Sequence, residues 1–274
     1  MQNISQTKNS KQTIVTAADN SFVDFLSVLL MSLKINNQGS FEVFILNDGL
    51  NKETEAKLKR ISNNSFELYF IYIPDFKNKI SFSSQLTDPH FWRLIAPHFL
   101  HDKERILYID ADTMVRKDIS ELFSMYQTKK TISASIDYLE KVETGISNWK
   151  DFNFNPENYY FNSGVLLINN ERFIEKKIAE QVIEITEKYL RYTKACNKWQ
   201  QYDQYGLNVV LYDDWFNLPN IYNYGSELEF KDAEIVHFNG HGKPTSNSCT
   251  AQYKNEFYNY LNKVTNPKNQ SIIS

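Results

Sequence analysis

The chain has 274 residues, 42% of them apolar, and its 30 basic and 33 acidic residues leave a formal net charge of −3 at pH 7. This length suits one compact domain with a short terminal extension, and the lack of a basic excess argues against a nucleic-acid-binding protein. Cys196 and Cys249 are too few for a disulfide scaffold and lack the spacing of zinc ligands, which favours a reducing compartment. Aromatic residues make up 15% of the chain, a share that suits sugar stacking or an aromatic core.

No segment of the sequence has the pattern of a secretion signal or a membrane span. Residues 1–12 are polar, and we expect 1–11 to be disordered. The most apolar stretch, 22–33, is interrupted by Asp24 and Ser27 and is too short to cross a bilayer. We therefore expect a cytoplasmic protein, and a peripheral association with the inner face of the membrane stays open.

Apolar runs and amphipathic segments alternate through the first part of the chain. Strands are predicted at 13–17, 41–46 and 67–73, and helices at 22–33 and 52–61. A continuous apolar run such as 13–17 is typical of a strand buried on both faces of a parallel sheet. The alternation indicates βαβ units, and we predict an α/β fold with a mixed, mostly parallel sheet and helices on both faces.

The second part of the chain continues this pattern less regularly. After a loop at 74–89, the predicted elements in order are a helix at 91–100, strands at 105–109, 131–136 and 161–168, helices at 172–192 and 203–211, a strand at 234–238, and a helix after about residue 245. An aromatic, Asn-rich loop is expected at 149–160, where the rings suit either sugar stacking or a core. No linker separates domains, so the sequence predicts a single unit.

Two acids follow the strand predicted at 105–109. In an open parallel sheet, ligands bind outside the carboxyl ends of the strands, where Asp110 and Asp112 are expected to lie. Two carboxylates one residue apart can turn towards one hard divalent cation. An Asp-x-Asp pair occurs by chance about once in a chain of this length, so the preceding apolar strand gives this pair its weight. The alternative is a strand end capped by two solvated acids.

Two classes of enzyme place a carboxylate pair after a strand. In phosphatases of the haloacid-dehalogenase type, Thr or Val stands four residues after the first Asp, where this chain has Met114, and the pair follows the first strand of the chain. In nucleotide-sugar glycosyltransferases, the pair holds a divalent ion against the diphosphate of the donor. The second class fits this sequence better.

The run at 237–244, His-Phe-Asn-Gly-His-Gly-Lys-Pro, is the most specific local signal. Its two glycines let the backbone approach a ligand closely, and Lys243 can reach a phosphate. A neutral imidazole at His237 together with two carboxylates makes a reasonable Mn²⁺ or Mg²⁺ site. We interpret His241 as a loop residue, because the glycines argue against a helix that would align it with His237. The alternative is an exposed glycine-rich turn.

Five motifs occur together in a fixed order. They are Thr16-Ala17-Ala18-Asp19, Tyr108-Ile109-Asp110-Ala111-Asp112, Phe161-Asn162-Ser163-Gly164-Val165, Asp203-Gln204, and the His-x-x-Gly-x-x-Lys-Pro run that begins at His237. With these motifs the sequence resembles glycosyltransferase family 8, the retaining enzymes that include bacterial lipopolysaccharide galactosyltransferases and glycogenin. The likeness covers roughly residues 12–245, and five motifs together are far more specific than any one of them.

The resemblance implies a GT-A fold over 12–245, with a helical extension at 246–274, and it implies a role for each matching residue. The implied metal ligands are Asp110, Asp112 and His237. The implied nucleotide contacts are Ala17, Asp19, Asp110, Ala111, Asp112, His237, Gly240 and Lys243. The implied donor-sugar contacts are Arg93, Asn162, Ser163, Gly164, Asp203 and Gln204. Asp203 and Gln204 are also the implied catalytic residues, with Gln204 facing the anomeric carbon, and Asp137 is implied on the acceptor side.

Other roles stay open for three of these residues. Arg93 suits a surface ion pair, Asp203 suits an N-cap, and Asp137 suits an ordinary acid at a strand end. The sequence also departs from the family at Thr245, which follows Lys-Pro, and at 205–206, where Tyr-Gly leaves the choice of donor sugar undecided.

The implied reaction is the transfer of glucose or galactose from a UDP-sugar to a hydroxyl of a glycan, glycoprotein or glycolipid, with Mn²⁺ or Mg²⁺ as cofactor and retention of configuration. The match is to a bacterial branch that builds cell-surface glycans or glycosylates proteins. The alternatives are a sugar-nucleotide- or carbohydrate-binding protein without transfer activity, and a phosphatase with an Asp-x-Asp pair.

Overall fold

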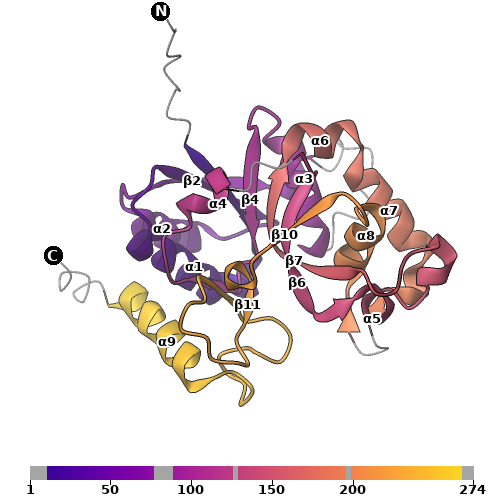
Figure 1. Ribbon diagram of the computed structural model, residues 1–274. Helices are drawn as coiled ribbons and strands as arrows, with labels where there is room; N and C mark the ends of the chain where they lie inside the picture. The colour runs from indigo at the N-terminus through magenta and orange to yellow at the C-terminus, as the bar shows by residue number, and fades with distance from the viewer. Residues whose placement is uncertain (1–10, 77–88, 126–128, 196–198, 267–274) are drawn as a thin grey trace, which may run out of the picture.

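The computed structural model describes residues 11–76, 89–125, 129–195 and 199–266, and within them a seven-stranded sheet forms the centre of the molecule (Figure 1). Its strands, in sheet order, are β10 (Trp215–Leu218), β6 (Ile132–Lys141), β7 (Tyr159–Asn169), β4 (Arg105–Ile109), β1 (Gln12–Ala17), β2 (Phe41–Asn47) and β3 (Glu67–Tyr72). Among these strands β7 is antiparallel to its neighbours β4 and β6, whereas the other pairs are parallel. The prediction of a mixed, mostly parallel sheet is confirmed.

Helices cover both faces of this sheet, because its strands are apolar on both sides. In β4, Leu107 and Ile109 pack in one core cluster with α1 and α2, while Ile106 and Tyr108 pack in another with α3, α7 and α8. This division follows the two-residue period of a strand. The helices are α1 (Val23–Asn36), α2 (Lys52–Ser62), α3 (Trp92–Phe99), α4 (Ser120–Met125), α5 (Val142–Gly145), α6 (Asn170–Glu175), α7 (Ile178–Lys188), α8 (Tyr202–Val210) and α9 (Ala251–Thr265).

The long helix predicted at 172–192 is wrong, because α6 and α7 are two separate helices. Lys177 lies between them with a φ of 51°, in the left-handed region, and α7 ends at Lys188. Phe173 of α6 and Ile178 of α7 are both buried against the same cluster. The apolar spacing therefore continues across the break, and periodicity alone does not reveal one residue with a positive φ.

A smaller sheet, which the sequence did not predict, continues directly from the carboxylate pair. It has the order β11 (Tyr224–Gly225), β12 (Ile235–His237) and β5 (Thr113–Val115). In the antiparallel pairing of β12 with β5, His237 lies opposite Thr113, and Phe238 donates its backbone N–H to the carbonyl oxygen of Asp112 (2.9 Å). This register brings the last strand of the chain beside residues 110–112.

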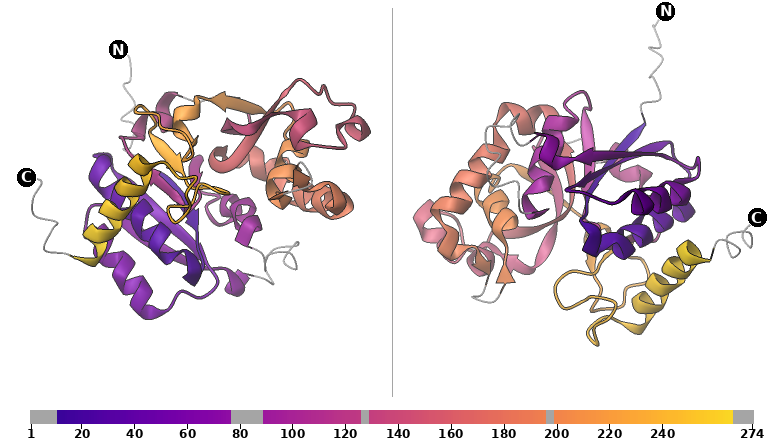
Figure 2. Two further views of the ribbon diagram at one scale, coloured as in Figure 1. Left: turned by 90° about the horizontal axis from the view of Figure 1, so that it is seen from below. Right: turned by 180° about the vertical axis from the view of Figure 1, so that it is seen from behind.

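The C-terminal helix α9 packs along α1 at one side of the molecule (Figure 2). Tyr253 and Phe257 of α9 are buried with Val28 of α1 and Phe238. Outside the sheets described so far, β8 (Lys194–Ala195) and β9 (Trp199–Gln200) form a two-stranded ribbon. None of the helices in the described residues is long and apolar enough to cross a membrane.

The aromatic loop at 149–160 contributes mainly to a core. Trp149, Phe152 and Phe154 pack on a cluster that includes the buried Tyr205, and the Phe154 ring stacks on Tyr212 with centroids 3.8 Å apart. These rings pack against one another, so they do not form a surface for a ligand. Much of the aromatic surplus in this part of the chain is therefore explained by packing.

Candidate active site

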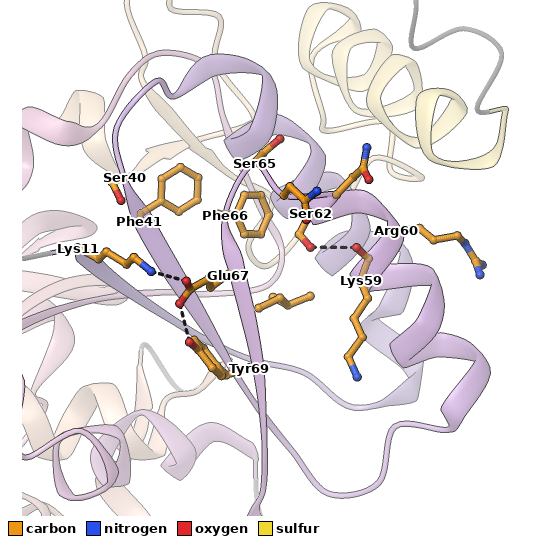
Figure 3. A pocket seen from close by; sticks show the side chains of 13 residues that line it. Lys11, Ser40, Phe41, Lys59, Arg60, Ser62, Ser65, Phe66, Glu67 and Tyr69 are labelled. Atoms are coloured by element: carbon orange, nitrogen blue, oxygen red, sulfur yellow. Dashed lines mark hydrogen bonds and ion pairs between the residues drawn. The ribbon is translucent and has the colours of Figure 1, made fainter.

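The structure has two hollows of interest, and they lie at opposite ends of the central sheet. The first, about 720 Å³, lies where β2 and β3 begin (Figure 3). The stacked rings of Phe41 and Phe66 form part of its wall, and Glu67 binds Lys11 and the hydroxyl of Tyr69. This carboxylate is already paired, and the sequence motifs lie elsewhere. We therefore assign no catalytic or binding role to this hollow.

The second hollow, a cleft of about 420 Å³, lies where β4 ends and β12 ends. Most of the residues that the sequence predicted for the site line it, and they come from widely separated parts of the chain. The predicted residues in its wall are Arg93, Asp110, Asp112, Asp137, Asn162, Ser163, Gly164, Asp203, Gln204, His237, Gly240 and Lys243. The antiparallel direction of β7 explains part of this convergence, since it brings residues 162–164 to the carboxyl end of β4, where Asp110 donates its backbone N–H to the carbonyl oxygen of Gly164 (2.8 Å).

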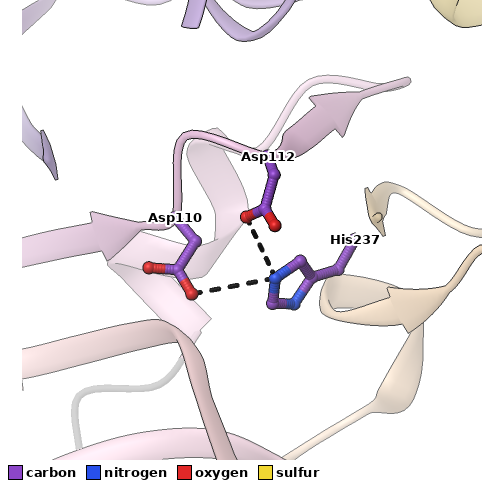
Figure 4. Close-up of side chains that lie close together, drawn as sticks. All are labelled: Asp110, Asp112 and His237. Carbon is purple, nitrogen blue, oxygen red and sulfur yellow. Dashed lines mark ion pairs between the residues drawn. The ribbon is translucent and has the colours of Figure 1, made fainter. Parts of the chain in front are cut away.

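Asp110, Asp112 and His237 present one ligand atom each to a common point (Figure 4). Nε2 of His237 lies 3.2 Å from Oδ1 of Asp112 and 3.7 Å from Oδ2 of Asp110. The three ligand atoms lie within 4.8 Å of one another. This is the set of three residues that the sequence analysis expected to hold a metal.

The second oxygen of each carboxylate is held by a cation. Nη2 of Arg93 lies 2.9 Å from Oδ1 of Asp110, which also accepts the hydroxyl hydrogen of Tyr108 (3.0 Å). Lys243 binds Oδ2 of Asp112. Each acid is thus fixed at one oxygen and presents the other to His237. Two carboxylate oxygens and one imidazole nitrogen are suitable ligands for Mn²⁺ or Mg²⁺, so the residues fit a divalent cation.

The charges around the two acids shift their pKa values in opposite directions. Burial by itself would raise the pKa of Asp112, but His237 and Lys243 lower that pKa well below its ordinary value. Burial raises the pKa of Asp110, and the negative charge of Asp112 adds to this effect although Arg93 opposes it. Asp112 is therefore the more firmly ionised acid of the pair.

Arg93 lies at the centre of the buried polar network. Its side chain is 8% exposed, and its Nε lies 3.0 Å from Oδ2 of Asp203 while its Nη1 donates to the carbonyl oxygen of Ser163 (2.6 Å). Its guanidinium carbon lies 4.9 Å from the centre of the Tyr108 ring. The alternative role of a surface ion pair does not describe Arg93.

Asp203 and Gln204 lie in the first turn of α8 and face the cleft. The N-cap of this helix is Gln201, so Asp203 does not have the capping role considered above. Oε1 of Gln204 accepts the backbone N–H of Ser163 (2.9 Å), and its Nε2 donates to Oδ2 of Asp137 (3.2 Å). Burial raises the pKa of Asp137, although hydrogen bonds to its carboxylate oppose the shift.

Three predicted nucleotide contacts are near the cleft without lining it. Ala17 ends β1, and Asp19 follows it and accepts the backbone N–H groups of Ser21 (2.7 Å) and Phe22 (3.2 Å). Ala111 is buried between the two acids. Asp19 therefore shapes the turn that leads into α1, and Phe22 from that turn does line the cleft.

Several residues that complete the site were not predicted from the sequence. Tyr108 was predicted as a strand residue, although its hydroxyl binds Asp110. Asn223 precedes β11, and its Oδ1 lies 2.9 Å from Nδ1 of His237. Tyr138, which is 65% exposed, lines the cleft next to Asp137. The alternation of strand 105–109 could have placed Tyr108 on the face of α3, but no local pattern marks Asn223.

Gly164 is required by the imidazole that packs against it, which gives a testable prediction. A Cβ atom at this position would lie 2.3 Å from Cε1 of His237. We expect Gly164→Ala to displace His237, to cost about 1–3 kcal/mol in the free energy of unfolding, and to weaken Mn²⁺ binding. Denaturant unfolding and Mn²⁺ titration measure the two effects. Gly39→Ala, which meets only the movable Ser120 hydroxyl at 2.8 Å, is the control. Unchanged stability and affinity in Gly164→Ala would contradict the prediction.

Residues 13–248 match the sequence family described as Glycosyl transferase family 8. The chain belongs to this family. It is 24% identical over 290 residues to General stress protein A of Bacillus subtilis (strain 168), a match that covers 95% of this chain and 98% of that protein. It is 26% identical over 270 residues to glycosyltransferase GlyD of Streptococcus pneumoniae serotype 4, covering 91% of this chain and 30% of GlyD.

Solved structures with the same fold include two glycosyltransferases. The galactosyltransferase LgtC, solved in complex with donor and acceptor sugar analogs, has a TM-score of 0.73 and 22% identity, covering 93% of this chain and 97% of LgtC. GlyE of Streptococcus pneumoniae TIGR4 has a TM-score of 0.68 and 20% identity, covering 92% of this chain and 60% of that one. The predicted GT-A fold and the resemblance to family 8 are confirmed. Membership of this family implies a sugar-nucleotide donor and a glycan acceptor.

Proposed function

We propose that this family 8 glycosyltransferase moves a hexose, glucose or galactose, from a UDP-sugar to a hydroxyl of a glycan, glycoprotein or glycolipid, with retention of anomeric configuration and dependence on Mn²⁺ or Mg²⁺. The observation that supports this most is the convergence of Asp110, Asp112 and His237 in a cleft that also holds Lys243 and the buried amide of Gln204. Such a cleft joins a site for a metal and diphosphate to a site for a sugar.

The chemical difficulty is charge, because the departing UDP gains negative charge while the sugar gains positive charge. A divalent ion held by Asp110, Asp112 and His237 would supply electrostatic stabilisation of the leaving diphosphate. Lys243 forms an ion pair with Asp112. From this position its ammonium can also reach a phosphate bound in the cleft. Gly240, with a φ of 47° and open space where a Cβ would lie, allows the backbone of the same loop to approach the donor.

Donor-sugar contacts are proposed for Arg93, Asn162, Ser163, Gly164, Asp203 and Gln204, and nucleotide contacts for Ala17, Asp19 and Ala111 besides the metal ligands. An amide is a poor nucleophile, and both polar atoms of Gln204 already bond within the protein, to Ser163 and Asp137. This supports an attack on the face of the leaving group, in which the acceptor oxygen bonds to the anomeric carbon as the phosphate oxygen departs. The acceptor's proton then passes to that phosphate oxygen.

We place the acceptor beside Asp137 and Tyr138. Asp137 is buried and holds the amides of Asn162 and Gln204, whereas Tyr138 offers an exposed ring at the same wall of the cleft. A ring of this kind suits stacking of a sugar. The proposed location is the cytoplasm, and a peripheral association with the inner face of the membrane stays open.

Hydrolysis of a panel of UDP-sugars, with Mn²⁺ and without acceptor, tests the proposal. We expect turnover of UDP-glucose or UDP-galactose and loss of turnover when a chelator removes the metal. Turnover of no UDP-sugar, together with UDP binding that ignores Mn²⁺, would instead indicate a binding protein. Release of phosphate from a sugar phosphate would indicate the phosphatase alternative.

A further inference from the structure

His237 can ligate a metal through Nε2 only if that nitrogen carries no hydrogen. In a neutral imidazole one nitrogen carries the hydrogen and the other has the free electron pair. Nε2 faces Asp110 and Asp112, and Nδ1 lies 2.9 Å from Oδ1 of Asn223. Without metal, the two acids can accept a hydrogen bond from Nε2. When a cation occupies the acids and Nε2, the remaining hydrogen lies on Nδ1 and needs an acceptor there, which Asn223 offers if it cannot turn its amide around.

The orientation of Asn223 is fixed by its other neighbour, Asn162. Oδ1 of Asn162 accepts the backbone N–H of Gly164 (2.8 Å), and its Nδ2 donates to Oδ2 of Asp137 (2.8 Å). A backbone N–H can only donate, so this oxygen must face Gly164. Nδ2 of Asn223 donates to the same oxygen (2.8 Å), which leaves Oδ1 of Asn223 to face the imidazole.

A chain of hydrogen bonds thus runs from Asp137 through Asn162 and Asn223 to His237. The polarity of the chain is defined at Asn162, because Asp137 accepts from its Nδ2 and the Gly164 N–H donates to its Oδ1. Asn223 is 9% exposed and His237 4% exposed, so water has little room to replace either partner. An oxygen that accepts from Nδ1 is the arrangement that commonly orients metal-binding histidines.

We propose that Asn223 is a positioning residue that holds His237 in the Nδ1–H tautomer and so keeps Nε2 available as a metal ligand. The proposal deepens the proposed metal-dependent transfer and rests on it. It assigns a role to a residue that lies outside the motifs shared with the family. It also explains why Asn162, besides any contact with a sugar, is held so firmly on both sides.

The test compares Asn223→Ala and Asn223→Asp with the wild type. Aspartate keeps an oxygen that accepts from Nδ1 but loses the donor to Asn162, whereas alanine removes both groups. Protein labelled with ¹⁵N at histidine is observed by NMR with saturating Mg²⁺, which is diamagnetic, and the His237 signals are assigned by their loss in His237→Gln. We expect Nδ1–H in the wild type and in Asn223→Asp, and a shift towards Nε2–H in Asn223→Ala.

Mn²⁺ affinity, measured by electron paramagnetic resonance, is the second readout. We expect Asn223→Ala to bind Mn²⁺ about 10- to 100-fold more weakly, and Asn223→Asp to recover part of that affinity. Asn158→Ala, which removes a part-buried amide that donates to the Tyr212 hydroxyl (2.6 Å), is the control for loss of an amide.

The two readouts separate this inference from the proposed function. An Nε2–H tautomer in the wild type, or an Nδ1–H tautomer and wild-type affinity in folded Asn223→Ala, would overturn the role of Asn223. If the tautomer and the Mn²⁺ affinities respond as expected while the wild type turns over no UDP-sugar, the positioning of His237 holds and the proposed function fails. If Asn223→Ala does not fold, the wild-type tautomer and the Asn223→Asp variant decide the question.

Discussion

Asp112→Asn should bind Mn²⁺ far more weakly than the wild type and should lose most of its turnover of a UDP-sugar. The substitution keeps the shape of the side chain but removes the charge that both His237 and Lys243 face. We expect the loss of Mn²⁺ affinity to exceed the roughly 10- to 100-fold loss that follows from removing a residue that only supports a metal ligand. Mn²⁺ titration and hydrolysis of the donor without acceptor measure the two effects.

The matched control for this change is Asp118→Asn. Asp118 accepts the backbone N–H of Ser120 (2.8 Å) at the start of α4, away from the cleft, and asparagine can accept the same hydrogen bond. We expect this control to keep both metal binding and turnover. Wild-type Mn²⁺ affinity and turnover in folded Asp112→Asn would refute the metal site as we describe it.

Arg93→Met should unfold at a much lower denaturant concentration than the wild type. The buried guanidinium contacts Asp110 and Asp203 at 2.9 and 3.0 Å, and its removal leaves two acids without their cation. Breaking a buried ion pair from one side costs about 3–5 kcal/mol. Arg93→Lys should recover only part of this loss, because one ammonium cannot reproduce contacts made by Nε, Nη1 and Nη2.

The destabilisation by Arg93→Met should also depend on pH. Burial already raises the pKa of Asp110 although Arg93 is present, and removing the positive charge raises that pKa further. An acid with a raised pKa in the folded state destabilises that state increasingly as the pH rises through the range in which it would ionise. The deficit should therefore be larger at neutral pH than at mildly acidic pH, as denaturant unfolding at several pH values would measure.

Arg172→Met provides the comparison for Arg93→Met. Arg172 lies 3.6 Å from Asp214 in an ion pair that is partly exposed at both side chains. Such a pair contributes at most about 1 kcal/mol, so the control should unfold close to the wild type. Equal losses of stability in the two variants would contradict the larger contribution that we expect from the buried ion pairs of Arg93.

Much of the central sheet follows from local sequence. Mostly apolar runs predicted the strands at 13–17 and 105–109 nearly to their observed ends, because a strand buried on both faces does not alternate between apolar and charged residues. The helix predicted at 172–192 was wrong at Lys177, since the apolar period says nothing about one backbone angle. The strand at 113–115 was not predicted, because its three residues are too short to show a period.

The types of residue that form the site are visible in the sequence, since Asp110, Asp112 and His237 each follow or end an apolar run that a sheet would bury. The register of β12 against β5 brings His237 beside the two acids, and the reversed direction of β7 brings residues 162–164 to the same place. Hydrogen bonds between strands set both features, and they join residues that lie far apart in the chain. The pairing of β11 with β12 brings Asn223 against His237, a contact that no local pattern in the sequence indicates.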